Sequence, residues 1–190
     1  MIEGFEPKGV INIGMEKVDG SPESFLSNFA QTKFELDGIV YPSIESFYQS
    51  LRIPPDNQLK YLVASEQNPK IALKKVRKYI KKIKREAQQP DPTKSIYYQN
   101  EVYKYGSPEH HQIVKMALVA KFTQNEQAKK ALLSTKDQVI THILIKHDGN
   151  RVKDSIGLPG GLFCNTLMEI RDRLKNIKLI KLNICPHPKC

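Results

Sequence analysis

The segment "TKFELDGIVYPSIESFYQSLR" (residues 32–52) restricts the fold more than any other stretch of this chain. Asp37-Gly38 stands between two runs rich in β-branched and aromatic residues, and such a dipeptide is typical of the type I′ turn of a tight hairpin. Ser43 then predicts the N-cap of a helix that ends after about Arg52, because Pro54-Pro55 cannot continue it. We therefore expect a hairpin followed directly by a short helix.

The rest of the chain alternates helical periodicity with short β-rich runs, which predicts a helix-rich α+β fold. We expect one compact domain over residues 1–180 with small β-hairpin elements, followed by a loose C-terminal tail, 181–190. The predicted strands are residues 9–14, a tyrosine-rich hairpin at 95–107 and an apolar strand at 138–145. The predicted helices are a brief turn after Ser21, then 57–66, 70–85, 107–125, 126–135 and a last helix that buries Phe163, Leu167, Ile170, Leu174 and Ile177. A polar loop is expected over 146–161.

The composition, with 39% hydrophobic and 26% charged residues, is ordinary for a soluble globular protein. No run approaches the roughly 18 apolar residues of a membrane span. The N-terminus "MIEGFEPKGVINIG" lacks the basic and apolar segments of a signal peptide. We therefore expect a cytoplasmic protein that does not contact membranes, with a monomer somewhat favoured.

The formal net charge of +10 favours polyanionic partners such as nucleic acids, nucleotides or phosphates. Much of this charge lies in "KIALKKVRKYIKKIKRE" (residues 70–86), where Ile71, Val76, Ile80 and Ile83 are predicted to form the buried stripe. The basic face of this helix could be solvated or could face phosphates, and the sequence leaves both interpretations open.

Metal and cofactor sites are not expected. Cys164 lies in an apolar helical pattern and is predicted to be a small buried hydrophobic residue. Cys185, His187 and Cys190 offer three ligands on a proline-broken end without a second cluster, so a loose tail is favoured over a zinc site. The motifs GxxxxGK[ST], GxGxxG and HExxH are absent from the sequence. His110-His111 are neighbours about 100° apart on a helix, for which we expect a capping or surface role.

Glu45, Gln49 and Arg52 follow one another at i, i+4 and i+7, which places a carboxylate, an amide and a guanidinium on one stripe of the helix after Ser43. Two interpretations stay open. Glu45 could be a first-turn acid that is stabilised by the helix dipole and by Arg52. It could also be a carboxylate at the mouth of a polar cleft, where the neighbouring Tyr48 would help to hold a planar base.

The segments "LSNFAQTKFELDGIVYPSIESFYQSLR", "KMALVAKFTQNEQAKKALLST" and "LMEIRDRL" occur in this order between residues 26 and 174. In order and spacing they resemble the NADAR family, which is named for its association with NAD and ADP-ribose metabolism and includes the YbiA-type N-glycosidases. The resemblance implies a compact helix-rich domain that cleaves an N-glycosidic bond between a ribose and a base. Members are linked to removing ADP-ribose from guanine in nucleic acids, or to hydrolysing ribosylamino-pyrimidine intermediates of flavin synthesis.

The resemblance also implies which residues take part in catalysis. Glu45 matches the family glutamate, and Asp148 matches an aspartate that normally precedes a Trp-Gly pair, which is missing here. Asp154 is a second acidic candidate. His142 stands where many members have glutamate, although it could equally be a satisfied histidine on a buried strand.

The expected substrate-binding residues come from the same motifs. Asn28 and Phe29 match an SNF element and Gln49 matches a family glutamine. Arg77 stands where a Gly-Arg pair usually lies, with Val76 in place of the glycine.

The chain departs from the family pattern at Arg52, where most members carry lysine. A lysine amine can form a Schiff base with an opened sugar, whereas a guanidinium stays protonated and cannot. Arg52 could still bind a phosphate through two parallel hydrogen bonds.

These assignments predict a division of labour during cleavage. Glu45 would stabilise the cationic sugar or activate water. Asp148, Asp154 or His142 would donate a proton or a hydrogen bond to the departing base. The two aspartates could instead orient ribose hydroxyls. The binding roles would be hydrogen bonds from Asn28, stacking by Phe29 or Tyr48, and pyrophosphate contacts from Arg52 and Arg77.

Three functional hypotheses follow. The first is an N-glycosidase that removes ADP-ribose from guanine in nucleic acid. The second is the same chemistry on a small nucleotide-like molecule such as a ribosylamino pyrimidine. The third is a catalytically inactive module that binds ADP-ribose or nucleic acid.

Overall fold

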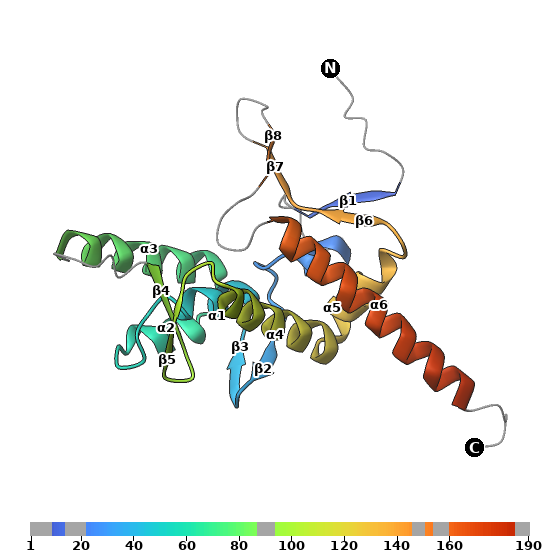
Figure 1. Cartoon of the computed structure of the whole chain (residues 1–190), viewed down its shortest axis with the longest axis horizontal. Helices are drawn as coiled ribbons and strands as arrows, with labels where there is room; N and C mark the ends of the chain where they lie inside the picture. Colours follow the sequence, from blue (N-terminus) through green and yellow to red (C-terminus); the bar gives the residue numbers. More distant parts are fainter. Residues whose placement is uncertain (1–8, 14–21, 87–93, 146–150, 154–159, 185–190) are drawn as a thin grey trace.

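The computed structural model describes residues 9–13, 22–86, 94–145, 151–153 and 160–184. Helices dominate this part of the chain and small two-stranded sheets lie among them (Figure 1), which confirms the predicted helix-rich α+β class. The helices are η1 (Pro22–Leu26), α1 (Ile44–Ser50), α2 (Leu59–Ala64), α3 (Pro69–Glu86), α4 (Pro108–Gln124), α5 (Glu126–Ser134) and α6 (Gly160–Ile184). Among the described helices, none is both long and apolar enough to cross a membrane.

Three of the sheets are local antiparallel pairs: β2 (Phe34–Leu36) with β3 (Ile39–Tyr41), β4 (Ser95–Tyr98) with β5 (Glu101–Lys104), and β7 (Ile143–Ile145) with β8 (Arg151–Lys153). The fourth pair is parallel and joins distant parts of the chain, β1 (Val10–Asn12) and β6 (Val139–Thr141). Figure 1 shows this parallel pair beside α6, while the β4–β5 hairpin lies near α2 and α3 at the opposite end of the molecule.

The predicted hairpin at Asp37-Gly38 is confirmed. Both turn residues have positive φ, 52° for Asp37 and 75° for Gly38, as a type I′ turn requires. The helix that follows is also confirmed: the side chain of Ser43 accepts a hydrogen bond from the backbone N–H of Ser46. This cap satisfies one of the free N–H groups at the start of α1 and fixes where the helix begins.

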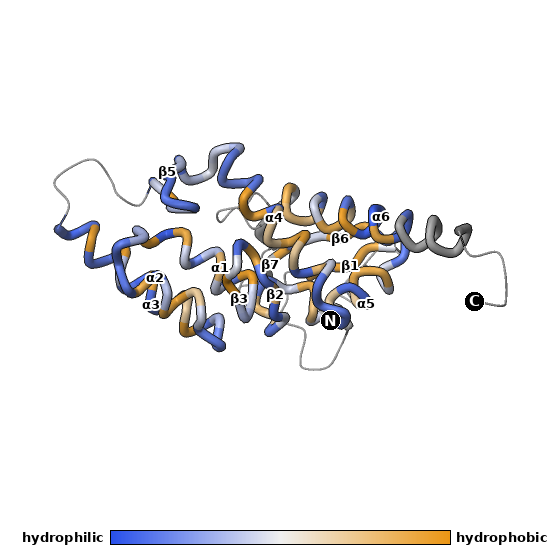
Figure 2. The backbone as a smooth tube through the Cα atoms, turned by 90° about the horizontal axis from the view of Figure 1, so that it is seen from below, coloured by the Kyte–Doolittle hydropathy of each residue, from blue (hydrophilic) through white to orange (hydrophobic). Residues whose placement is uncertain are grey.

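A main core joins α1, α4, α5 and α6 with the β1–β6 pair. Figure 2 shows hydrophobic stretches on α4 and on β1 and β6 in the middle of the molecule. The buried residues of α6 include Phe163, Cys164, Leu167, Ile170 and Leu174, as the 4-3-4 spacing predicts, whereas the side chain of Ile177 lies outside the described part. A second, smaller cluster holds α2 and α3 together and contains Ile53, Val63, Ala72 and Val76.

Three local predictions need correction. Residues 138–145 form two strands, β6 and β7, because the side-chain amide of Asn12 exchanges hydrogen bonds with the backbone of Ile143 and interrupts the pairing at His142. The expected polar loop contains the strand β8. In α3, Val76 is buried and Ile80 and Ile83 are half-buried, but Ile71 is 42% exposed and Ala72 takes its place in the core.

We predict that Ser43→Ala destabilises the protein by about 1–2 kcal/mol, the usual cost of losing an N-cap. Ser43 is fully buried, and the variant removes both the acceptor of the Ser46 backbone N–H and the hydrogen bond to the Ser46 hydroxyl, which keeps its bond to the carbonyl of Glu66. Urea unfolding measures the change. Ser134→Ala, at an exposed hydroxyl that bonds only within its own helix, is the control and should change the unfolding free energy little.

Candidate active site

Glu45 lies inside the protein although it begins the first turn of a short helix. Glu45 is only 8% exposed. Its Oε1 accepts a hydrogen bond of 2.8 Å from Nε2 of Gln49, one turn later in the helix. Gln49 is itself buried, at 6% exposure. The first two residues of the expected stripe therefore form a buried, hydrogen-bonded carboxylate–amide pair.

The loop after η1 lies directly against the start of α1. The backbone carbonyl of Asn28 accepts a hydrogen bond of 3.0 Å from the backbone N–H of Glu45, and the Phe29 N–H is held by the Ser27 hydroxyl at 3.1 Å. The side-chain oxygen of Asn28 is buried and has no hydrogen-bond partner among the described residues. A buried acceptor without a donor is costly, so this oxygen is a candidate for receiving a hydrogen bond from a ligand.

Lys121 holds the same loop from the side of α4. It is fully buried, and its Nζ donates a hydrogen bond of 2.8 Å to the carbonyl of Ser27 while lying 5.0 Å from the ring centroid of Phe122. Burial lowers the pKa of Lys121 to about 7, because the charged amine has lost its water. The position of Asn28 thus depends on two contacts, one from α1 and one from α4.

An aromatic cluster adjoins the other side of α1. The hydroxyls of Tyr48 and Tyr105 share a hydrogen bond of 2.7 Å, and both rings pack against the imidazole of His110, with centroids 5.6 and 5.0 Å away. The guanidinium of Arg52 lies over the Tyr105 ring, 4.5 Å from its centroid. Burial, with the hydrogen bond to Tyr105, raises the pKa of Tyr48 far above its usual value, so this hydroxyl stays protonated.

His110 is fully buried, so of its two expected roles the surface role is wrong, whereas its contact with Gly106 just before α4 agrees with the capping role. Its Nδ1 accepts a hydrogen bond of 3.0 Å from the backbone N–H of Gly106, which places the proton of the neutral ring on Nε2. That Nε2 has no partner among the described residues, and the same is true of the buried Nε2 of His111. Burial, and then the nearby His111 and Arg52, lower the pKa of His110 to about 4, so the ring is neutral near pH 7.

The structure brings together six of the expected residues and leaves others apart. Asn28 and Phe29 lie in the loop against α1, Glu45, Tyr48 and Gln49 lie on α1 itself, and Arg52 lies two residues after its end. Arg77 is exposed on α3, and no contact within the described residues joins it to this group. His142 lies between β6 and β7, where its ring meets that of Phe163 edge-on at 5.9 Å. Asp148 and Asp154 lie outside the described residues.

Three residues of this region were not predicted from the sequence: Tyr105, His110 and Lys121. His110 follows the Ser107 cap by three residues, but this spacing is common to many helices and does not indicate burial. Tyr105 follows a tyrosine-rich hairpin, and only the pairing of β4 with β5 brings it to Arg52. Within the described part of the chain, no group of three or more His, Cys, Asp or Glu side chains could hold a metal ion, and the segment with Cys185, His187 and Cys190 lies outside that part.

Comparison with known proteins places the chain in a family. Residues 20–172 match the family model described as bacteriophage protein GP30.3, and this match covers well over half of the chain. The chain belongs to the GP30.3 family. No curated protein sequence matches this GP30.3 family member.

A solved structure with a similar fold is the NMR structure of the Escherichia coli protein YbiA. The two share 20% sequence identity with a TM-score of 0.60, and the match covers 94% of this chain and 92% of YbiA. At this identity the likeness concerns the fold. The YbiA-like fold that the sequence motifs imply is therefore confirmed over nearly the whole length of the GP30.3 family member.

The lowered pKa of Lys121 predicts how stability depends on pH. Between about pH 7 and pH 10 the unfolded chain holds a proton on this amine that the folded protein does not, so the free energy of unfolding rises with pH in this window. Lys121→Met lacks this contribution. We expect the wild type to gain stability relative to the variant as the pH rises, by at most about 1.4 kcal/mol per pH unit.

Chemical unfolding at several pH values tests this dependence. Lys130→Met, at an exposed position on α5, is the control and should show a difference from the wild type that does not change with pH. A constant difference for Lys121→Met as well would mean that the buried amine keeps its proton throughout this range.

Proposed function

We propose that this protein is an N-glycosidase that hydrolyses a ribosyl N-glycosidic bond, and that its substrate is ADP-ribose attached to guanine in nucleic acid. The single observation that carries the proposal is the burial of Glu45 with Gln49, next to the unpaired side-chain oxygen of Asn28. Burying a carboxylate is costly unless it is paired or used, and catalytic acids and bases are often found in such surroundings. The motif order and the YbiA-like fold support the same activity.

The chemistry breaks the bond between C1′ of ribose and a nitrogen of the base, and forms a bond between C1′ and the oxygen of water. Positive charge develops on the sugar as the base departs, and the Glu45 carboxylate stabilises this charge and accepts a proton from the attacking water. The departing nitrogen receives a proton in return. We expect the donor to be His142, Asp148 or Asp154, as the family resemblance suggests.

The neighbours of Glu45 would bind the rest of the substrate. The Asn28 side-chain oxygen accepts a hydrogen bond from a ribose hydroxyl or from the base. The half-buried ring of Phe29 stacks on the base. Arg52, whose guanidinium carbon lies over the Tyr105 ring, contacts the pyrophosphate, because a guanidinium can bind phosphate oxygens through two parallel hydrogen bonds. In the proposed function Gln49 orients Glu45, and Tyr48 supports Arg52 through Tyr105.

The stacking of Arg52 on Tyr105 also favours a second candidate function. A guanidinium held in this way is suited to binding, and it stands where most members of the resembled family carry a lysine. A catalytically inactive module that binds ADP-ribose would use the same residues without turnover. A small ribosylamino-pyrimidine substrate would undergo the same type of bond cleavage, but with a pyrimidine as the leaving group and without ADP or nucleic acid.

Glu45→Gln tests the enzymatic proposal. The amide keeps the size of the side chain and a hydrogen bond to Gln49, but it can neither accept a proton nor stabilise a cation. We expect kcat to fall by about 100-fold to 10,000-fold, the usual contribution of a general acid–base group. The measurement is release of ADP-ribose from guanine-ADP-ribosylated oligonucleotide, and release of the base from a ribosylamino pyrimidine and from NAD, each incubated separately.

Glu35→Gln, at an exposed position on β2, is the matched control and should leave the rate unchanged. Turnover of the oligonucleotide that Glu45→Gln abolishes supports the first proposal. Turnover of the pyrimidine alone would replace the nucleic-acid substrate by the small one. No turnover of any substrate, with binding of ADP-ribose intact, would leave the binding module as the function.

Arg52→Lys separates a phosphate contact from covalent chemistry. If Arg52 binds the pyrophosphate, the lysine loses the planar contact with Tyr105 and the second hydrogen bond. KM should then rise about tenfold, equivalent to about 1.4 kcal/mol, with kcat little changed. A rise in kcat, together with trapping of a sugar–protein adduct by borohydride, would show instead that an amine at this position takes part in the reaction.

A further inference from the structure

The helix α3 carries most of the excess positive charge of the protein. Its 18 residues, PKIALKKVRKYIKKIKRE, contain nine lysine or arginine residues and one carboxylate. Nine minus one gives a net charge of +8, compared with +10 for the whole chain. The nearby helix α2 contains no Asp or Glu, so it does not neutralise the positive charge of α3.

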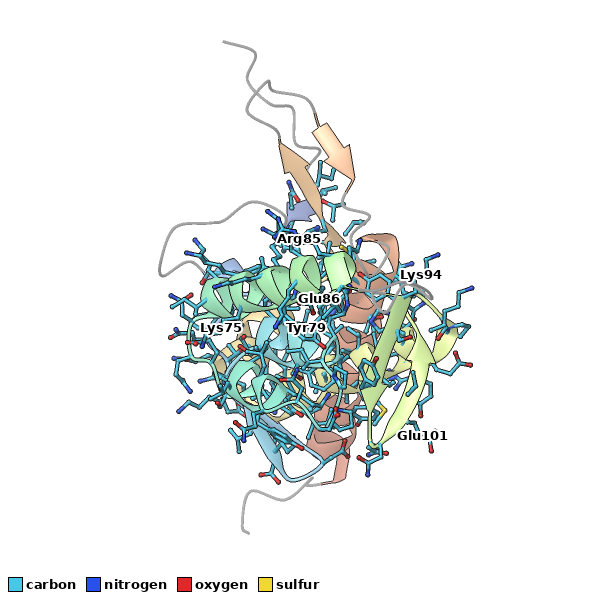
Figure 3. All side chains as sticks on the ribbon, turned by 90° about the vertical axis from the view of Figure 1, so that its left-hand side faces the viewer. Lys75, Tyr79, Arg85, Glu86, Lys94 and Glu101 are labelled. Carbon is cyan, nitrogen blue, oxygen red and sulfur yellow. The ribbon has the colours of Figure 1, made fainter. Side chains whose placement is uncertain are left out.

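Packing turns this charge outward. Ala72 and Val76 are buried, and Tyr79 and Ile80 pack beside them against the cluster that contains Ile53 and Val63. The lysine and arginine residues occupy the remaining arc of the helix, and apart from the half-buried Lys75 all of them are exposed. Figure 3 looks onto this end of the molecule, where Tyr79 lies on the inner side of α3 and Arg85 on the outer side.

Like charges are stacked along the outer face. Five pairs of cations are separated by four residues, the spacing at which helix side chains are neighbours and like charges destabilise the helix. These pairs are Lys70–Lys74, Lys74–Lys78, Arg77–Lys81, Lys78–Lys82 and Lys81–Arg85. Among the described residues, a carboxylate pairs with this helix at Lys75, which lies 2.6 Å from Glu66 at the edge of the arc. A helix with such repulsion gains stability when a polyanion binds along it.

We propose that the outer face of α3 is a nucleic-acid-binding surface that contacts the phosphate backbone. From Lys70 to Arg85 the helix rises about 22 Å, which matches the length of about six or seven phosphates along one strand. A row of cations with no hydrogen-bonding pattern for base edges binds phosphates without regard to sequence. The surface therefore serves to hold the polymer, while the chemistry takes place elsewhere.

An anionic membrane is a poorer match for this helix. Basic amphipathic helices bind lipid surfaces by inserting a free apolar face below the headgroups. The apolar face of α3 is already covered by residues of α2 and of the segment after α1, such as Val63 and Ile53. Apart from Ile71 and the terminal Glu86, the exposed residues of α3 are cations, and a row of fixed cations is suited to a linear polyphosphate backbone.

This inference deepens the proposed function and rests on it in one respect: it assigns the polymer part of the substrate to α3 and the ADP-ribosyl part to the region of Glu45. Binding to unmodified nucleic acid needs no catalysis, so the two ideas can fail separately. A protein that binds the polymer through α3 but cleaves nothing would contradict the proposed reaction alone.

The test replaces four cations at the centre of the outer face, in the variant Lys74→Gln, Lys78→Gln, Lys81→Gln and Arg85→Gln. The matched control removes three exposed lysines and one exposed arginine elsewhere, in the variant Lys33→Gln, Lys104→Gln, Lys130→Gln and Arg173→Gln. Both variants lower the net charge by the same amount. Thermal unfolding of each confirms that the fold is kept.

The measurement is fluorescence anisotropy of a labelled single-stranded oligonucleotide, of about 20 nucleotides, over a series of salt concentrations. For the α3 variant we expect Kd to rise at least about tenfold at low salt, and the slope of log Kd against log salt to fall by about 3, since each lost phosphate contact removes about 0.7. The control variant should bind nearly as the wild type does. Equal losses in both variants, or no binding by the wild type, would overturn the proposal.

Two further measurements separate the alternatives. Cleavage of a mononucleotide that carries ADP-ribose on guanine should be unchanged in the α3 variant and lost in Glu45→Gln, because α3 does not touch the reacting atoms. Binding of the wild type to phosphatidylserine vesicles, combined with no binding to the oligonucleotide, would make α3 a membrane-binding helix and overturn the assignment to nucleic acid.

Discussion

The region around the proposed active site depends on how two neighbouring peptide carbonyls are held. The carbonyl of Ser27 accepts a hydrogen bond from Lys121 of α4, and the carbonyl of Asn28 accepts one from the backbone N–H of Glu45 in α1. These two bonds fix a loop that follows η1 against two helices from distant parts of the chain. Because the loop and the first turn of α1 position each other, the carboxylate of Glu45 and the side chain of Asn28 have a defined relation.

The same region concentrates polar groups that are expensive to bury. Lys121 and His110 are fully buried with lowered pKa values, and the Asn28 oxygen and the His110 Nε2 have no partner among the described residues. A domain selected only for stability would replace such groups by apolar ones, because each unsatisfied polar atom costs free energy. Their collection around α1, beside the apolar core that this helix also joins, is the pattern expected where a ligand completes the hydrogen bonding.

Polymer binding is proposed for α3 and bond cleavage for the region of Glu45. A short segment after α1 connects these two regions. Arg52 follows α1 and is the last residue of the stripe that begins with Glu45 and Gln49. Ile53, directly after it, belongs to the small apolar cluster that holds α3. The basic helix is thus attached to the core immediately beyond the site. A rigid connection of this kind lets a polymer that is bound along α3 present a modified base at a fixed distance from Glu45.

The sequence by itself determined the local structure of the site. The turn at Asp37-Gly38, the Ser43 cap, the stripe of Glu45 and Gln49 and the buried positions of α6 all follow from interactions between residues within a few positions of each other. Such interactions can be predicted from propensity and periodicity because they need no knowledge of the rest of the chain.

Only the tertiary structure decided which distant groups join that stripe. The contact of Lys121 with Ser27 spans 94 positions, and the parallel pairing of β1 with β6 joins the start of the described chain to residues 139–141. Neither the burial of His110 nor the placement of Arg52 on Tyr105 has a local signal. These contacts arise from the packing of whole helices and strands, whose free energy is shared among many residues and so leaves no pattern at any one of them.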